Sequence, residues 1–458
     1  MLFFASDGIG AATCSLPNKI LRFAMNKRLS MLALSLLAVA LLAAPAFAAQ
    51  VSVVVDRPGQ NLTRVVLAPP MGGGGSVQAL NDAVTTNMRI LPFVEMLDSR
   101  SIPGGGTVST PTAQGIDFKP FLMAGANLLI TTNWVSSSQV ELRAFEVSEG
   151  KFIFGNRYDV GGGSEGAADV ADKFCADFLE NIIGKGDFFR STMAFSKSGG
   201  AGKKDIWSVK PNGRHLRQLT NIKGEAISPT WSPDGRFVLF TSIDPRSHAL
   251  GIYDNTTKST QRTKFPGNTV IGPCFMPDSR VAVGLTDGRN PSIFLLSRNF
   301  QKESKLEGSN GIDVSPSVDA SGRLMAFTSS RAGGPQVYVK DLSSGSVRRV
   351  SMTGDYNTDP SISPDGTLVA YAKRMGGGHR IFVADLRTGQ ETQITNGPGS
   401  DEEPAFAPDG YFVAFMSTSG GGKRIYFTTR FGGRPTMLPT GAGDAAFPAW
   451  GTTMRSGN

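Results

Sequence analysis

Pro229-Thr-Trp-Ser-Pro-Asp-Gly235 is the first of five similar segments in the carboxyl-terminal part of this sequence. The other four are Pro273-Cys-Phe-Met-Pro-Asp-Ser279, Pro316-Ser-Val-Asp-Ala-Ser-Gly322, Pro360-Ser-Ile-Ser-Pro-Asp-Gly366 and Pro404-Ala-Phe-Ala-Pro-Asp-Gly410, and a sixth begins at Pro448-Ala-Trp450. The leading prolines are 43 or 44 residues apart. A period of this length is typical of β-propeller blades, each of which holds four short strands.

Each repeat also contains the strands that a blade requires. The Asp-Gly dipeptide, often preceded by proline, predicts a tight turn, because proline fixes φ and glycine accepts a positive φ. An apolar strand follows the turn, as in Phe237–Phe240, and then a second strand, as in Gln336–Val339. A short last strand, such as Val347–Val350, ends the unit.

The two ends of the repeat region complement each other. Thr192-Met-Ala-Phe195 matches the apolar strand of the other units but lacks a proline-led strand before it, whereas Pro448–Trp450 is a proline-led strand without a unit. We expect residues 448–450 to complete the first unit and close the ring, which removes exposed edges. The sequence therefore predicts an all-β, six-bladed β-propeller over residues 190–451, with a tail at 452–458. An open array of five or seven units is the alternative.

The amino terminus has the features of a secretory signal peptide. Lys27 and Arg28 precede an apolar run from Leu32 to Leu42, and the small residues that follow predict cleavage after Ala48. Because such a signal would begin naturally at Met25, residues 1–24 are interpreted as an upstream extension or a mis-assigned start. A retained membrane anchor is the alternative, which the shortness of the apolar run disfavours.

Residues 49–187 show strands alternating with helices. Val65–Ala68 and Asn127–Asn133 are predicted strands, and residues 140–147 and 152–158 are predicted to form a hairpin. Ser76 is expected to cap one helix. A second, amphipathic helix is predicted over Glu165–Ile183, with Gly184 at its carboxyl-terminal cap. This alternation predicts a small α/β domain ahead of the propeller.

Charge and cysteine content exclude several classes of protein. The formal net charge of +8 becomes +5 once residues 1–48 are removed, and no run of lysine or arginine remains, so nucleic-acid binding is not predicted. Cys175 and Cys274 fall in different predicted domains, and we expect no disulfide between them. Export without a disulfide framework is typical of a protein of the bacterial periplasm.

One short motif raises the question of catalysis. Gly162-Gly-Ser-Glu-Gly166 matches the G-x-S-x-G pattern of serine hydrolases, which also need a histidine base. The histidines of the chain, His215, His248 and His379, all lie in the predicted propeller. We therefore interpret Ser164 as the cap of the helix beginning at Glu165, and no catalytic residue is predicted.

The sequence predicts neither a metal site nor a cofactor site. The carboxylates that recur at blade period lie in the repeat turns, where aspartate is an ordinary turn former, so calcium binding is the less favoured interpretation. These residues are Asp234, Asp278, Asp365 and Asp409.

Two segments are candidates for binding a partner. The loops that lead into the proline-led strands are polar and mostly acidic, which suits a partner that presents lysine or arginine at the propeller mouth. The candidate residues there are Glu225, Thr269, Asp313, Asn357, Asp359, Asp401, Glu402 and Glu403. The second segment is the mature amino terminus, whose strand-like pattern can add to a sheet edge. Its candidate residues are Val51, Val53, Val55 and Asp56. The alternatives are solvated loops and an ordinary first strand of the α/β domain.

With its signal peptide, α/β domain and propeller, the sequence resembles the TolB family of the bacterial Tol-Pal system over essentially the whole mature chain. The sharpest matches are Pro229–Gly235, Gly334-Pro-Gln-Val-Tyr338 and the closing Phe447-Pro-Ala-Trp450, and Val51–Asp56 is similar to the segment by which that family engages TolA. Members of the family carry a histidine in the loop before the second full proline-led strand. This chain has Asn268-Thr-Val-Ile-Gly272 there instead.

The resemblance implies a non-enzymatic, monomeric adaptor of the periplasm. It would bind the peptidoglycan-associated lipoprotein Pal at the propeller mouth and TolA through its amino-terminal segment. It would be peripheral to the outer membrane through Pal, without spanning it, and would support outer-membrane integrity and constriction during cell division. A propeller accessory or ligand-binding module of a periplasmic hydrolase or lectin-like system is the alternative.

Overall fold

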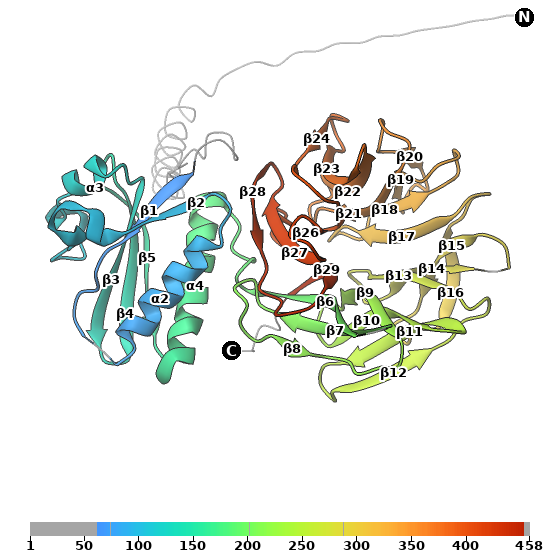
Figure 1. The fold of residues 1–458 in the computed structure, drawn as a ribbon, viewed down its shortest axis with the longest axis horizontal. Helices are drawn as coiled ribbons and strands as arrows, with labels where there is room; N and C mark the ends of the chain where they lie inside the picture. Colours follow the sequence, from blue (N-terminus) through green and yellow to red (C-terminus); the bar gives the residue numbers. More distant parts are fainter. Residues whose placement is uncertain (1–61, 74, 201, 287, 453–458) are drawn as a thin grey trace, which may run out of the picture. The chain divides into compact units, whose positions relative to one another are not determined.

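The computed structural model of the protein describes residues 62–452, except residues 74, 201 and 287. The predicted signal cleavage site, Ala48, lies outside the described residues, as do the predicted TolA-binding residues Val51, Val53, Val55 and Asp56. The described part contains an α/β region followed by a β-propeller (Figure 1).

The α/β region is built on a five-stranded sheet with the strand order β2-β1-β3-β4-β5. Its strands and α-helices are, in chain order, β1 (Thr63–Leu67), α2 (Val77–Arg89), β2 (Val94–Leu97), α3 (Lys119–Met123), β3 (Leu128–Ser136), β4 (Gln139–Glu146), β5 (Lys151–Asp159) and α4 (Gly163–Ile183). Three short 3-10 helices, Ser99–Ser101, Pro103–Gly106 and Ala113–Gly115, lie between β2 and α3. Strand β1 is parallel to β2 and β3, whereas β3, β4 and β5 are antiparallel. The predicted strands and hairpin are confirmed, and β2 is an addition.

This sheet is covered on both faces because apolar side chains alternate along its strands. Val65 belongs to the core that includes α2 and α4, and Val66 belongs to the core on the other face, which includes Phe121 of α3. Helices α2 and α4 pack side by side (Figure 1). The predicted carboxyl-terminal cap of α4 is confirmed, because Gly184 has a φ of 73° in the left-handed region.

The two serines expected to cap helices do not do so. Ser76 occupies the N-cap position of α2 but makes no capping hydrogen bond. Helix α4 begins at Gly163 with Gly162 as N-cap, so Ser164 lies inside the first turn and the prediction that it caps the helix was wrong. Gly163, the first residue of α4, has a φ of 70°, a conformation that glycine adopts readily, and it brings the chain into the helix one residue before Ser164.

The propeller consists of sheets in which most neighbouring strands are antiparallel and consecutive in sequence. Four of these sheets have four strands each. The first two are β13 (Val270–Phe275), β14 (Val281–Thr286), β15 (Pro291–Leu296) and β16 (Lys302–Glu307), and then β17 (Asp313–Val318), β18 (Leu324–Ser329), β19 (Gln336–Asp341) and β20 (Val347–Arg349). The other two are β21 (Asn357–Ile362), β22 (Leu368–Met375), β23 (Gly378–Asp385) and β24 (Glu391–Gln393), and then β25 (Asp401–Phe406), β26 (Phe412–Ser417), β27 (Arg424–Thr429) and β28 (Gly432–Met437).

A further sheet of eight strands contains two such units. Its strands are β6 (Ser191–Gly200), β7 (Lys203–Val209), β8 (Arg217–Gln218), β9 (Glu225–Trp231), β10 (Phe237–Asp244), β11 (Ser247–Asp254), β12 (Ser259–Thr263) and β29 (Ala445–Thr452). Strand β29 pairs with β6, with Trp450 opposite Met193, so the predicted pairing of residues 448–450 with the strand from Thr192 is confirmed. The inner strands β9, β13, β17, β21, β25 and β29 each contact the next, and β29 contacts β9, which closes the ring (Figure 1).

Every inner strand has an irregularity just before its leading proline. The residue at this position has a φ between 51° and 58° in all of these strands, namely Ser228, Gly272, Ser315, Asp359, Glu403 and Phe447. The pairing register with the next strand shifts at the same point. Proline has no N–H to donate and so fits such a bulge, and the N–H of the residue before it can bond outside the ladder, as that of Asp359 does to the Thr328 hydroxyl at 3.2 Å.

A buried polar cluster connects α4 with the loop after β7. The Asp172 side chain is 7% exposed and accepts hydrogen bonds from Lys210 at 2.7 Å and from Arg214 at 2.8 Å. A buried aromatic contact lies close by in sequence, where the ring of Phe188 is 4.3 Å from that of Phe412 and 5.5 Å from that of Trp450, measured between centroids. The polar cluster thus joins α4 to the loop after β7, and the aromatic contact joins Phe188 to strands β26 and β29.

Candidate functional site

The predicted mouth residues lie at one end of the propeller strands. Glu225, Asp313, Asn357 and Asp401 are the first residues of β9, β17, β21 and β25, and Thr269 immediately precedes β13. Because these inner strands are equivalent in the repeat, their first residues meet on one face of the propeller. We call this the mouth face, and we call the opposite end, where inner strands turn back, the turn face.

Three of the predicted residues are buried and hold the loops of the mouth face together. Asp313 is fully buried and accepts hydrogen bonds from Arg331 at 2.9 Å and from the Ser309 backbone N–H at 2.6 Å. The Asn357 amide donates to the Gln336 side-chain oxygen at 2.7 Å. Asp401 is also buried. These side chains position the loops and are not available to a partner in this conformation.

Basic side chains balance most of the exposed acids of the mouth face. Glu225 is 2.7 Å from Lys204 Nζ, and Asp355 is 2.9 Å from an Arg374 guanidinium nitrogen. Arg380 lies 3.8 Å from Asp401. The face is therefore a mixture of both signs, whereas the sequence reasoning considered only its acids. Arg380 and Arg424 are 44 residues apart and occupy the same position in equivalent strands, so the sequence repeat already indicated basic residues at this position.

Two carboxyl groups at the bulges are exceptions to this balance. Asp359 and Glu403 both precede leading prolines and have left-handed backbones. Burial raises the pKa of Glu403 to about 8, despite the hydrogen bond that its carboxylate accepts from the Phe447 N–H. Burial also raises the pKa of Asp359, and the nearby Glu402 carboxylate adds to the effect. Glu403 thus holds its proton at neutral pH and can donate a hydrogen bond, whereas a cationic partner group would favour the ionised form.

Glu402 occupies a more conventional polar setting beside this pair. Its Oε1 accepts a hydrogen bond from the Ser400 hydroxyl at 2.6 Å and lies 3.3 Å from His379 Nδ1. The His379 ring in turn packs near the Tyr356 ring, with centroids 5.9 Å apart. His379 therefore belongs to the mouth face, although the position named from the resemblance, at 268–272, carries no histidine.

Exposed apolar side chains complete the mouth face. Ile312, directly before β17, is 45% exposed, and Met352, in the loop before β21, is 60% exposed. Met375, near the end of β22, is 41% exposed. Methionine and aromatic side chains are enriched in protein interfaces, and these residues were missed because single apolar residues in loops carry no periodic signal. The mouth face thus combines apolar, cationic and protonated acidic groups.

The G-x-S-x-G segment does not form a hydrolase site. The structure brings His215 close to α4, but its Nε2 lies 2.7 Å from Glu165 Oε1. Ser164, the adjacent residue, is exposed and forms no hydrogen bond to any histidine among the described residues. A serine nucleophile needs a histidine bonded to its hydroxyl, so the geometry gives no support to a catalytic role.

The aspartates that recur once per blade each accept a hydrogen bond from a backbone N–H of the turn in which they lie. Asp234 accepts from the Arg236 N–H at 3.0 Å, Asp365 from the Thr367 N–H at 3.1 Å, and Asp409 from the Tyr411 N–H at 2.8 Å. Asp278 accepts from the Arg280 N–H at 3.0 Å. Over residues 62–452, apart from residues 74, 201 and 287, no group of three or more histidine, cysteine, aspartate or glutamate residues is arranged to hold a metal ion.

The described residues also test the sequence predictions about a disulfide and about a membrane span. Cys175 and Cys274 are both free, as expected from the sequence. None of the helices within the described residues is long and apolar enough to cross a membrane.

Comparison with known protein families agrees with this architecture. Residues 179–454 match the model of the TolB beta propeller domain, which is more than half of the chain. The Tol-Pal system protein TolB of Nitratidesulfovibrio vulgaris is 50% identical over 300 residues, which span 63% of this chain and 67% of that protein. The protein TolB homolog of Chlorobium chlorochromatii is 32% identical over 228 residues, about half the length of each chain.

A solved structure has the same fold. The crystal structure of TolB from Acinetobacter baumannii aligns with a TM-score of 0.74 and covers 86% of this chain and 98% of that one, at 21% sequence identity. At this level of identity the similarity extends to the fold.

Proposed function

This chain belongs to the TolB family and is a Tol-Pal system protein, and we propose that it is a non-enzymatic periplasmic adaptor that binds Pal at the mouth face of its propeller. Residues 49–187 would form the α/β domain and residues 190–451 a six-bladed propeller, with residues 1–48 removed on export. The adaptor would be a monomer, peripheral to the outer membrane through Pal, and would support outer-membrane integrity and constriction during cell division.

The composition of the mouth face is the observation that supports Pal binding most. Met352 and Ile312 offer exposed apolar area, and Glu403 offers a protonated carboxyl beside Asp359 and Glu402. A partner that inserts a lysine or arginine among these groups would convert them to paired carboxylates in a partly dehydrated site, where such pairs discriminate strongly between partners. We propose Glu225, Thr269, Asp359, Glu402 and Glu403 as the contact residues, with Asp313, Asn357 and Asp401 acting through the loops that they hold.

Calorimetric titration with the purified periplasmic domain of Pal tests this assignment. Met352→Ala and Glu403→Gln are each expected to weaken binding about tenfold, which corresponds to about 1.4 kcal/mol. Glu303→Gln, on β16 outside the mouth face, is the matched control and is expected to bind like the wild type. Absence of Pal binding at low salt, or equal losses in the control, would contradict the proposal.

We further propose that Val51, Val53, Val55 and Asp56 bind TolA by strand addition. These residues lie outside the described part, and the proposal rests on the sequence pattern and on the family. Deletion of residues 49–56 is expected to abolish TolA binding and leave Pal binding intact or stronger. TolA binding that survives the deletion would overturn this assignment without affecting the Pal assignment.

A further inference from the structure

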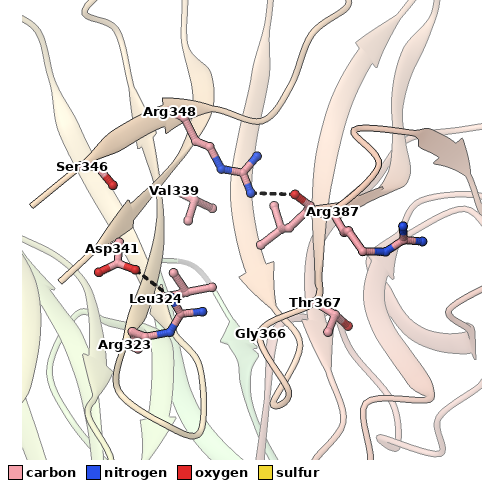
Figure 2. Close-up of a pocket in the computed structure, with 10 residues that line it drawn as sticks. Arg323, Leu324, Val339, Asp341, Ser346, Arg348, Gly366, Thr367 and Arg387 are labelled. Atoms are coloured by element: carbon pink, nitrogen blue, oxygen red, sulfur yellow. Dashed lines mark hydrogen bonds and ion pairs between the residues drawn. The ribbon is translucent and has the colours of Figure 1, made fainter. Parts of the chain in front are cut away.

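A pocket of about 340 Å³ opens between two neighbouring blades of the propeller (Figure 2). The β17–β20 blade contributes Arg323, Val339 and Arg348, and the β21–β24 blade contributes Leu386 and Arg387. Arg323 lies in the turn between β17 and β18, and Leu386 follows β23, so the pocket lies at the turn face. It is therefore distinct from the mouth face, where β17 and β21 begin.

The pocket carries positive charge that the protein itself does not neutralise. Arg348 donates one hydrogen bond across the seam, from Nη2 to the Leu386 carbonyl oxygen at 2.8 Å, which leaves most of its N–H groups open (Figure 2). Arg387 extends from the rim, and its side chain forms no hydrogen bond or ion pair with the described residues. Neither guanidinium group forms an ion pair with a described carboxylate, although the Arg387 charge contributes to lowering the pKa of the partly exposed Asp385 nearby.

The third arginine is already neutralised. Arg323 Nη1 is 2.7 Å from Asp341 Oδ2. Hydrogen bonds from the Ser343 hydroxyl and the backbone of the same turn, together with the Arg323 charge, hold the pKa of Asp341 well below its usual range. The Asp341 carboxylate is thus ionised at neutral pH and fixes Arg323 in place. The net charge of the lining comes from Arg348 and Arg387.

The remaining wall is aliphatic. Val339 forms part of it and is almost completely buried, with the partly exposed side chains of Leu324 and Leu386 on either side. A bare inorganic anion would leave this surface in contact with water. A ligand that complements the whole pocket has an anionic group for the arginines and a short apolar group for the leucines and valine.

The repeat shows that the two free arginines are not required to build a blade. Arg348 lies opposite Val339 in its strand pair, and the equivalent residue of the next blade, opposite Val383, is Thr392. Arg387 donates its backbone N–H to the aspartate that ends the preceding strand, and Ser343 does the same in the previous blade. Because threonine and serine suffice at these positions, the arginines are features of this seam and not of the fold.

We infer that this pocket binds the carboxylate of a small branched aliphatic acid, such as the carboxyl terminus of a peptide that ends in leucine. The guanidinium groups of Arg348 and Arg387 would bind the carboxylate, because their planar N–H pairs match its two oxygens. The aliphatic side chain would lie against Leu324, Val339 and Leu386. A volume of about 340 Å³ is near the lower end of small-molecule pockets and holds a ligand of amino-acid size.

Saturation-transfer NMR titrations of the mature chain with N-acetyl-leucine test this inference. A ligand of this size is expected to bind with a Kd of about 1–10 mM. N-acetyl-leucinamide, which lacks the carboxylate, and N-acetylglycine, which lacks the side chain, are each expected to bind at least fivefold more weakly. Equal binding of 4-methylpentanoate would identify a simple fatty acid as the source of the carboxylate, whereas weaker binding would favour a peptide terminus; both results retain the pocket.

Variants locate the binding. Arg348→Ala and Arg387→Ala are each expected to weaken N-acetyl-leucine binding at least fivefold. Arg262→Ala, on the outer strand β12 where Arg262 pairs with Asp244 at 2.9 Å, is the matched control and is expected to change nothing. Inorganic phosphate that competes as well as N-acetyl-leucine would overturn the inference in favour of a plain anion site. Binding unaffected by both pocket variants, with their folds intact by circular dichroism, would overturn it altogether.

Discussion

Replacing Glu403 by glutamine should change how the stability of the propeller depends on pH. The pKa of this carboxyl is about 8 in the folded chain, against 4.5 for an ordinary glutamate, because the partly exposed side chain is largely desolvated where it lies at the inner strand β25. Between these two values the folded chain keeps the proton and the unfolded chain has released it. Unfolding therefore liberates a proton, and the free energy of unfolding falls by about 1.4 kcal/mol for each unit of pH.

The total effect follows from the width of this window. At and below pH 4.5 the contribution is fully present, and it is lost progressively as the pH rises to about 8. The full span corresponds to about 5 kcal/mol. Glutamine has nearly the same shape, does not titrate, and keeps a side-chain oxygen that can accept the Phe447 N–H. The difference in unfolding free energy, E403Q minus wild type, is thus expected to increase by about 3 kcal/mol from pH 5 to pH 7.5.

Urea unfolding at a series of pH values measures this difference directly. The chain has four tryptophans, and Trp207, Trp231 and Trp450 lie in propeller strands, so their fluorescence reports mainly on the propeller. Subtracting the two proteins removes the titration of every other group that the substitution leaves undisturbed. Glu149→Gln, an exposed loop position, is the control. A difference that stays flat, or that decreases with pH, would show that Glu403 is ionised in the folded chain and would refute the reasoning.

Three further substitutions probe the packing that supports the propeller. Phe188→Ala should lower the free energy of unfolding by about 3–5 kcal/mol, measured by urea unfolding, because the buried ring contacts Phe412 and Trp450. Asp172→Ala should cost about 3–5 kcal/mol by the same measurement, since it leaves the partly buried Lys210 without its carboxylate and Arg214 with only exposed ones, whereas Asp169→Ala at an exposed position should cost less than 1 kcal/mol. Gly251→Ala should lower the melting temperature, because an added Cβ would lie 2.1 Å from the Phe240 ring and overpacking costs about 1–3 kcal/mol.

The parts of the fold that could be predicted from the sequence are those that many residues specify together. The strand pattern of the propeller repeats along the chain, so each unit supports the interpretation of the others, and the closure by β29 follows from an unpaired segment at each end. Helix α4 was predicted from its apolar face and from Gly184. Strand β2, with only four residues, was not, because its pairing with β1 is determined by packing beneath α2.

The candidate site was harder to predict because side-chain type does not report burial. Asp313 and Asp359 occur in similar acidic loops, yet Asp313 pairs with Arg331, whereas desolvation and, to a smaller extent, the Glu402 charge raise the pKa of Asp359. The difference arises from residues that lie far apart in sequence. The positive φ of the residues before the leading prolines was not predicted either, since serine, aspartate, glutamate and phenylalanine share no local sequence signal for it.

These left-handed residues have an energetic cost that a single substitution can reveal. Ser228 has a φ of 51°, and a non-glycine residue in this region costs about 1–2 kcal/mol. Glycine removes that cost but loses more conformational entropy on folding, about 0.5–1 kcal/mol, so Ser228→Gly should be neutral or stabilising by up to about 1 kcal/mol. Ser304→Gly, in β16, is at a position without a positive φ, so it has no such strain to relieve and should be destabilising by about 0.5–1 kcal/mol. Urea unfolding should therefore separate the two variants by about 1–2 kcal/mol. Equal losses would mean that the inner strands relax around Ser228 without strain, and that Gly272 occupies the equivalent position for its small size alone.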